Sequence, residues 1–185
     1  MSERELIKKV DSLCMETLAP STYNAWQNVK TALYAGRTAL NMNYKLSNRS
    51  KTNLTGVRPD LIELIEEAIL DSPYDFGVPK YGGKRTQGDQ AELYAIGRTT
   101  ELDRKPVTYV DGVKKKSNHQ EKKDGYGWAF DIYIYDHVEK RASWSVEKLT
   151  AVADHIKAKA AAKGIKLTWG GNWKMKDYPH FEIKL

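Results

Sequence analysis

The feature that most limits the fold of this chain is an irregular succession of helical and strand-like patterns after Leu54. Apolar residues recur at helical spacing after Pro59 and again over residues 145–163, where Gly164 predicts the end of the helix. Residues 129–135 alternate and are rich in aromatic and β-branched side chains, which predicts a strand. Because these elements do not follow regular βαβ order, we expect an α+β fold with a mainly antiparallel sheet flanked by helices.

Shorter patterns complete this prediction. Residues 74–78, 165–169 and 180–183 are predicted strands, and a glycine-rich turn at 81–86 leads into a predicted helix at 90–96. Residues 107–110, followed by Asp-Gly, have the composition of a hairpin.

The first part of the chain has a different pattern. Ser2 and Glu5 have capping-box spacing ahead of an apolar helical face, and a second helical pattern covers residues 22–35. Two short helices cannot form a core by themselves. We therefore predict a helical N-terminal extension over 1–42 and a single main domain over 43–185, with the polar segment 43–53 at the boundary.

Composition excludes several classes of protein. No run approaches the roughly 18 apolar residues of a membrane span, and a lone cysteine, Cys14, excludes a disulfide framework or a multi-cysteine metal site. The charged N-terminus lacks the pattern of a secretory signal, so we expect synthesis in the cytoplasm. The net charge of +6 suggests an anionic partner, but no nucleic-acid-binding motif accompanies it.

Two of the four histidines are candidates for chemistry. His119 follows Ser117-Asn118 and precedes a charged loop that ends at Asp131, and His180 comes three residues after Asp177. Two imidazoles and a carboxylate form a three-ligand zinc site with an open fourth position, and a second carboxylate nearby can act as a general base. Spacing alone also allows ordinary structural histidines, which is our interpretation of His137 and His155.

Three blocks of motifs occur in one order along the chain. They are Gly83-Lys84-Arg85-Thr86 with Gln90 and residues 93–99; Ser-x-His at 117–119 with Gly-x-Ala-x-Asp at 127–131; and Trp169-Gly170-Gly171-Asn172-Trp173 with Asp-x-x-His-Phe-Glu at 177–182. This set resembles the zinc peptidase family of D-alanyl-D-alanine carboxypeptidases and phage L-alanyl-D-glutamate endopeptidases. Segments 46–50, 54–61 and 72–76 are similar to the phage branch, and the resemblance covers about residues 45–185.

The resemblance implies one Zn²⁺ per chain, bound by His119, Asp131 and His180, with Asp177 as the catalytic base. It implies that Arg85 binds the substrate and stabilises the developing oxyanion, and that residues 43–185 are the catalytic domain. Ser117, Trp169 and Trp173 are the remaining candidates for contact with substrate. The two tryptophans are equally compatible with packing. Glu182, which follows the last expected ligand in a predicted strand, is a candidate for a residue that surrounds the metal ligands.

One departure from the family pattern affects the carboxylate ligand. The compact form of the motif places the aspartate seven residues after the first histidine, where this chain has Tyr126, whereas Asp131 lies twelve residues on. A polar loop is easily lengthened, because its closure entropy grows slowly with length. Asp131 is therefore the expected ligand, with Asp124 as the weaker alternative.

The resemblance implies a phage endolysin, a peptidase that cuts the L-Ala–D-Glu bond of peptidoglycan after the host membrane has been permeabilised. We expect a monomer without a membrane span or a nucleic-acid partner. The alternatives are a D-Ala–D-Ala carboxypeptidase with the same metal site and a non-catalytic basic module that binds the wall. Lysines at 114–116 and 122–123 flank His119 and are either attractive to an anionic wall polymer or simply solvated.

Overall fold

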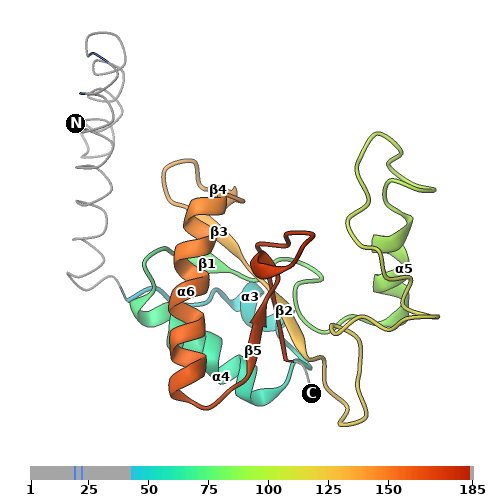
Figure 1. The fold of residues 1–185 in the computed structure, drawn as a ribbon, viewed down its shortest axis with the longest axis horizontal. Coiled ribbons are helices and arrows are strands. Elements are labelled where there is room, and N and C mark those ends of the chain that lie inside the picture. Colours follow the sequence, from blue (N-terminus) through green and yellow to red (C-terminus); the bar gives the residue numbers. More distant parts are fainter. Residues whose placement is uncertain (1–18, 20–21, 23–42, 184–185) are drawn as a thin grey trace.

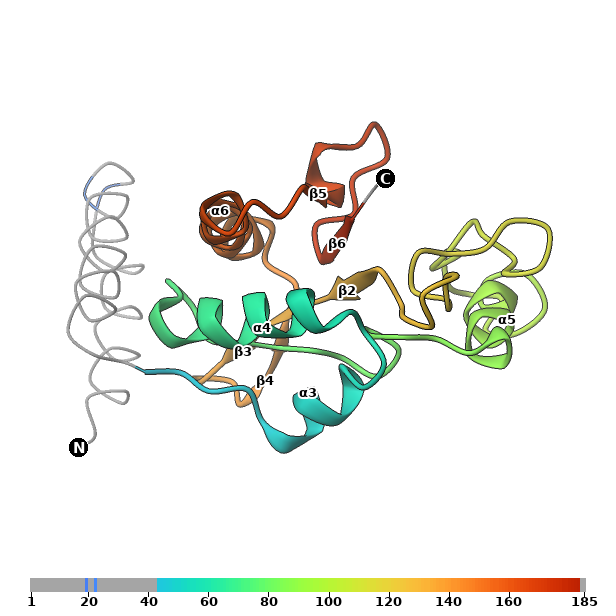
Figure 2. The same cartoon turned by 90° about the horizontal axis from the view of Figure 1, so that it is seen from below.

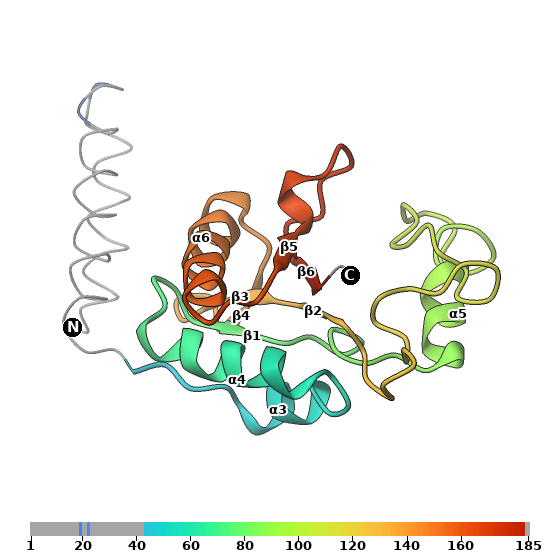
Figure 3. The same ribbon diagram turned by 60° about the horizontal axis from the view of Figure 1, so that its bottom comes forward.

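A computed structural model of the chain describes residues 43–183 together with Ala19 and Thr22 (Figure 1). Apart from those two residues, the helices predicted within 1–42 lie outside the described residues. In the described chain, α3 and α4 lie on one side of the strands, α6 covers another, and α5 stands apart with its loops (Figures 1 and 3).

The strands form two small antiparallel sheets. The first has the order β1-β3-β4, with β1 at Phe76–Gly77, β3 at Tyr133–Asp136 and β4 at Arg141–Ser143. The second has the order β2-β6-β5, with β2 at Ala129–Asp131, β6 at His180–Ile183 and β5 at Leu167–Trp169. The predicted α+β class with antiparallel strands flanked by helices is confirmed.

Two amphipathic helices supply much of the core. α4 spans Pro59–Ala68 with proline at its first turn, and α6 spans Val146–Ala162, where the Ser145 side chain accepts a hydrogen bond from the Lys148 N–H. Both were predicted, and they pack against each other (Figure 2). Gly164, at φ +71°, ends α6 as expected.

Four short helical segments complete the element order. They are α3 at Asn48–Asn53, η1 at Ile69–Asp71, α5 at Gln87–Ala95 and η2 at Gly170–Asn172. α5 begins three residues before the predicted start, because Thr86 caps it in a capping box with Asp89.

The predicted strand at 129–135 is two strands in different sheets. Asp131 donates its N–H to the carbonyl of Gly82 at 2.7 Å, and Ile132 donates to the carbonyl of Pro179 at 3.0 Å. The backbone therefore changes hydrogen-bonding partners between β2 and β3. The alternating sequence continues through this change because Phe130, Ile132 and Ile134 are all buried.

The predicted hairpin strand at 107–110 is wrong. The carbonyl of Thr108 accepts a hydrogen bond from Arg98 at 2.9 Å, and that of Val110 accepts one from Gln90 at 2.8 Å. Side chains thus donate the hydrogen bonds to these backbone carbonyls that a neighbouring strand would otherwise donate.

The polar segment 43–53 contains α3, which was not predicted. Ser47 caps this helix, and the buried Ser50 accepts a hydrogen bond from the N–H of Val78 at 3.1 Å. Asn53 donates to the Val78 carbonyl at 2.9 Å, so side chains of α3 hold the chain just beyond β1. β1 therefore ends at Gly77, one residue before the predicted end of the strand. β4 was also missed, because its sequence is short and mostly exposed.

The core joins α4, α6 and the strands of both sheets. Its most deeply buried large side chains are Leu54, Leu61, Leu64, Ile65, Ile69, Phe130, Ile132, Ile134, Leu149, Ile156 and Phe181. Within residues 43–183, no helix combines the length and apolar character needed to span a bilayer.

Replacing Leu64 by alanine removes a fully buried side chain of α4 and leaves a cavity. We expect a loss of about 2–5 kcal/mol in the free energy of unfolding. Leu70→Ala is the matched control, because Leu70 is 43% exposed and its truncation leaves little cavity. Urea unfolding of both variants measures the difference, and equal losses would contradict this description of the core.

Candidate metal centre and active site

Three potential metal ligands from distant parts of the chain converge at one point. His180 Nδ1 lies 2.9 Å from Asp131 Oδ1 and 3.1 Å from His119 Nε2, and His119 Nε2 lies 3.3 Å from Asp131 Oδ1. His119 and His180 are buried, and Asp131 is partly buried. The structure thus brings together the three ligands that the sequence predicted.

Strand pairing aligns two of these residues. Asp131 at the end of β2 is the register partner of His180 at the start of β6. The neighbouring pair, Phe130 and Phe181, points to the opposite face, where the two rings stack in the core at a centroid distance of 4.9 Å. Alternation along paired strands therefore buries the phenylalanines and turns the polar pair to the site.

His119 comes from a loop, and backbone contacts fix it. Its Nδ1 lies 2.8 Å from the carbonyl of Gly83, and its backbone carbonyl accepts a hydrogen bond from the Arg85 N–H at 2.9 Å. Its own N–H donates to Ser117 Oγ at 3.3 Å. With Nδ1–H donating to Gly83, the lone pair of Nε2 faces the other two ligands.

The donor set fits a tetrahedral divalent metal ion. Ligands about 2.0–2.1 Å from a zinc ion in tetrahedral geometry lie about 3.3 Å from one another. The three observed separations are 2.9, 3.1 and 3.3 Å. Two imidazole nitrogens and one carboxylate oxygen are also ligands that zinc prefers, so both distances and chemistry fit.

The charges around these ligands are strongly coupled. Burial by itself would raise the pKa of Asp131, but the adjacent His119, the hydrogen bonds from both histidines and the Arg85 guanidinium hold it well below the usual value. Burial lowers the pKa of His119. Burial would also lower the pKa of His180, but hydrogen bonds to Asp131 and Glu182 raise it to about 9.

Arg85 contacts the second oxygen of the Asp131 carboxylate. Its Nη2 donates to Asp131 Oδ2 at 2.6 Å, its Nε donates to the carbonyl of Tyr81 at 2.6 Å, and its Nη1 lies 3.3 Å from Gln90 Oε1. The side chain is 11% exposed. These contacts hold Asp131 Oδ2 and leave Oδ1 directed at the two histidines.

Asp177 lies close enough to Asp131 and His180 for its charge to interact with theirs. A turn joins it to His180, whose N–H donates to the Asp177 carbonyl at 3.2 Å, and the Asp177 N–H donates to the carbonyl of Gly170 at 3.1 Å. Desolvation raises the pKa of the Asp177 carboxyl group, and the nearby negative charge of Asp131 raises it further. Asp177 itself is exposed to solvent. An accessible carboxyl group with a raised pKa next to a candidate metal site is suited to proton transfer.

The comparisons with known proteins agree with this arrangement. The family of phage L-alanyl-D-glutamate peptidases matches residues 42–185. The chain belongs to this family. An L-alanyl-D-glutamate peptidase of Escherichia phage T5 is 29% identical over 144 residues, which cover 77% of this chain and 91% of the relative.

A solved structure supports the same assignment for the fold. The crystal structure of the Serratia marcescens L-Ala D-Glu endopeptidase ChiX is similar to this peptidase with a TM-score of 0.57 and 26% sequence identity. The similarity covers 77% of this chain and 92% of ChiX.

Of the other residues predicted for the site, one tryptophan lies against a candidate ligand, and two residues make their contacts elsewhere. The Trp173 ring lies 5.0 Å from the His180 ring, whereas Trp169 is in the core, 5% exposed, with its indole N–H bonded to the Tyr178 carbonyl at 2.8 Å. Trp169 therefore fits the packing interpretation. Asp124 binds the Trp128 indole N–H at 2.8 Å and is not among the converging ligands, so the peptidase presents Asp131 instead.

Sequence reasoning assigned no separate role to three residues that hold the site. Gly83 supplies the carbonyl for His119, Gln90 contacts Arg85, and Asn118 donates to Glu182 at 2.7 Å. Gly83 and Gln90 lie within the quoted motifs, and Asn118 is next to a ligand. Their positions were therefore visible in the sequence, but their contacts depend on the fold.

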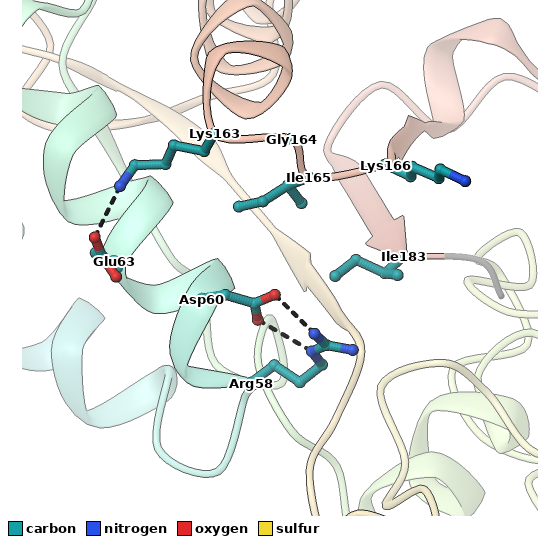
Figure 4. Close-up of a pocket in the computed structure, with 8 residues that line it drawn as sticks. All are labelled: Arg58, Asp60, Glu63, Lys163, Gly164, Ile165, Lys166 and Ile183. Carbon is teal, nitrogen blue, oxygen red and sulfur yellow. Dashed lines mark hydrogen bonds and ion pairs between the residues drawn. The ribbon is translucent and has the colours of Figure 1, made fainter.

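A separate hollow of about 580 Å³ lies away from these residues (Figure 4). Its charged side chains include two internal pairs, Arg58 with Asp60 at 2.7 Å and Lys163 with Glu63 at 2.8 Å. Ile183 of β6 lines this hollow, and along the strand it alternates with the site residues His180 and Glu182. The hollow is therefore distinct from the metal-type centre.

A methyl group at Gly83 tests how His119 is held. In Gly83→Ala the new Cβ would overlap the backbone carbonyl of Asn53, so the backbone must shift and carry the Gly83 carbonyl away from His119. We expect about 10–100-fold weaker Zn²⁺ binding and a lower melting temperature.

Gly88→Ala is the matched control for this substitution. Gly88 lies in α5, where a new Cβ has only an ordinary contact with Thr86 Oγ1 at 3.6 Å. Alanine favours a helix over glycine by up to about 1 kcal/mol, so this variant should keep its metal affinity and its stability. Chelator competition and thermal melts measure both, and unchanged zinc affinity in Gly83→Ala would contradict the assigned contact.

Proposed function

We propose that this peptidase is a zinc enzyme that hydrolyses the L-Ala–D-Glu bond of peptidoglycan stem peptides, with His119, Asp131 and His180 as its metal ligands. The convergence of these three donor atoms within 3.3 Å of one another carries the proposal. It is supported by the family match and by the names of the phage T5 and ChiX relatives.

A zinc ion bound by these residues would lower the pKa of a water molecule to about 7 and polarise the scissile carbonyl group. Asp177, next to His180, accepts the proton from the attacking water. The same carboxyl group then donates this proton to the departing amine of the D-Glu residue. Its raised pKa favours both transfers, because a general acid–base works best with a pKa near the operating pH.

Arg85 has two proposed functions. Its ion pair with Asp131 Oδ2 orients the carboxylate ligand. Its positive charge also stabilises the oxyanion that develops on the substrate carbonyl, for which one preorganised donor contributes about 3–4 kcal/mol. Ser117 and Trp173 are the proposed substrate contacts, because Ser117 precedes His119 and the Trp173 ring lies against His180.

The alternative functions are less well supported. The family and both relatives carry the L-Ala–D-Glu peptidase description, which favours this bond over D-Ala–D-Ala. The complete ligand set and the neighbouring Asp177 argue against a non-catalytic wall-binding module.

The remaining proposals concern the setting of the enzyme. We propose residues 43–185 as the catalytic unit, supported by the family match over 42–185. Action on the wall after the host membrane has been permeabilised, a monomeric state and the absence of a nucleic-acid partner stay predictions from the sequence.

Removing the proposed base tests the mechanism. Asp177→Ala should lower kcat by about 10²–10⁴-fold, because a positioned general acid–base contributes that much, while zinc content stays near one per chain. His119→Ala should lose both zinc and activity. Mass spectrometry of digested wall should reveal new D-Glu amino termini. Asp154→Asn, at an exposed ion pair on α6, is the control, and wild-type rates in Asp177→Ala would exclude this base.

The carboxyl group of Asp177 should reduce the stability of the metal-free protein. The pKa of Asp177 is higher in the folded than in the unfolded chain. The free energy of unfolding therefore falls as the pH rises from the ordinary aspartate pKa of about 3.9 to the raised pKa of the folded protein. Above the raised pKa the loss is complete. Asp177→Asn removes this loss, so metal-free protein should melt at a higher temperature than wild type at pH 7.

The difference in melting temperature should shrink at low pH, where Asp177 is protonated in both states. Thermal melts in the presence of a chelator measure it. A lower melting temperature for Asp177→Asn at pH 7 would show that the charged carboxylate is stabilised in the fold.

A further inference from the structure

His180 uses both of its ring nitrogens. Its Nδ1 faces the site, 2.9 Å from Asp131 Oδ1, and its Nε2 lies 3.1 Å from Glu182 Oε2. The same Glu182 oxygen accepts a hydrogen bond from Asn118 Nδ2 at 2.7 Å. A continuous chain of contacts therefore runs from Asn118, next to one proposed ligand, through Glu182 to another.

Strand geometry explains why Glu182 can reach His180. The two residues are at positions i and i+2 of β6, so their side chains lie on the same face. β6 is the central strand between β2 and β5, which fixes its backbone on both sides. Glu182 is 6% exposed. A buried carboxylate is costly without partners, and the contacts with Asn118 and His180 supply them.

The two histidines are held in opposite orientations. His119 gives Nδ1–H to a neutral backbone carbonyl and presents Nε2, whereas His180 places Nε2 against a carboxylate and presents Nδ1. A neutral imidazole has one N–H and one lone pair, so an N–H on the outer nitrogen leaves the inner nitrogen free to bind metal. A carboxylate partner also makes the imidazole a stronger ligand than a carbonyl does.

We propose that Glu182, held by Asn118, is a positioning residue that fixes the tautomer of His180 with Nδ1 as the metal ligand and thereby sets the zinc affinity of the peptidase. This inference rests on the proposed metal site but concerns residues beyond its three ligands. It also assigns a role to the glutamate that follows the Asp-x-x-His motif.

Three variants separate the parts of this chain of contacts. Glu182→Gln keeps the shape and an acceptor oxygen but loses the charge, Glu182→Ala loses both, and Asn118→Ala removes only the donor to Glu182. Glu63→Gln is the control, since Glu63 forms an exposed ion pair with Lys163 on the surface. Circular dichroism and thermal melts of each purified protein establish that it folds.

The first readout is the dissociation constant for Zn²⁺, measured by competition with a chromogenic chelator. Loss of a hydrogen-bonding partner of a metal ligand typically weakens binding by about 10–100-fold. We expect the loss in Glu182→Ala to lie in this range, with smaller losses in Glu182→Gln and Asn118→Ala and none in Glu63→Gln. A double variant that combines Asn118→Ala with Glu182→Ala should lose no more zinc affinity than Glu182→Ala alone, because Asn118 acts through Glu182.

The second readout is the visible absorption spectrum of Co²⁺-substituted protein, which reports the ligand field directly. We expect a changed spectrum in both Glu182 variants and an unchanged one in the control. If Glu182→Ala does not fold, the zinc affinities and Co²⁺ spectra of Glu182→Gln and Asn118→Ala still test whether Glu182 positions His180.

Wild-type zinc affinity together with a wild-type Co²⁺ spectrum in Glu182→Gln and Asn118→Ala would overturn the inference. That result leaves the proposed function intact as long as the wild-type protein binds one zinc and cuts the wall. By contrast, failure of the proposed function would appear in the wild-type protein itself, as the absence of stoichiometric zinc or of cleavage.

Discussion

The antiparallel pairing of β2 with β6 is the constraint on which the site depends. It sets Asp131 opposite His180 and at the same time stacks Phe130 on Phe181 in the core. A one-residue slip in this register would turn the polar pair into the core and the phenylalanines out of it. Burial of the aromatic pair therefore enforces the register that brings the two proposed ligands together, so the stability of the core and the geometry of the site depend on the same strand pairing.

The third proposed ligand, His119, is joined to this pair through a different kind of contact. His119 lies in a loop far from both strands in sequence, and hydrogen bonds to the backbone of Gly83 and Arg85 hold it. Arg85 in turn holds Asp131. The segment that follows β1 therefore links the loop to the sheet, which allows the loop between His119 and Asp131 to be long without loosening the site.

The polar groups around the proposed ligands pair with one another, and Glu182 among them is buried. Glu182, which accepts a hydrogen bond from Asn118, contacts the outer nitrogen of His180, and Arg85 contacts the outer oxygen of Asp131. The inner atoms are thereby left facing one another. Such preorganisation would reduce the rearrangement needed for a metal ion to bind. Beside these residues, desolvation and the negative charge of Asp131 disfavour the charged form of Asp177, so its carboxylate accepts a proton more readily than an ordinary aspartate.

Much of this molecule could be predicted from the sequence. Periodicity identified α4 and α6, and the ordered motifs identified the family and the residues that converge in the structure. Predictions from local sequence patterns were wrong where side chains, and not a neighbouring strand, form the hydrogen bonds to the backbone. Arg98 and Gln90 bind the segment at 107–110 that was predicted to be a strand, and Ser50 and Asn53 make a polar helix part of the buried structure.

The choice between Asp124 and Asp131 shows where sequence and tertiary structure divide. The sequence by itself determined the helices, the antiparallel class and the set of residues able to bind a metal, because these depend on periodicity and on side-chain chemistry. Only the tertiary structure decided which carboxylate and which nitrogen of each histidine face the centre. Those choices depend on strand register and on hydrogen bonds between residues 36 to 64 positions apart, which no local pattern encodes.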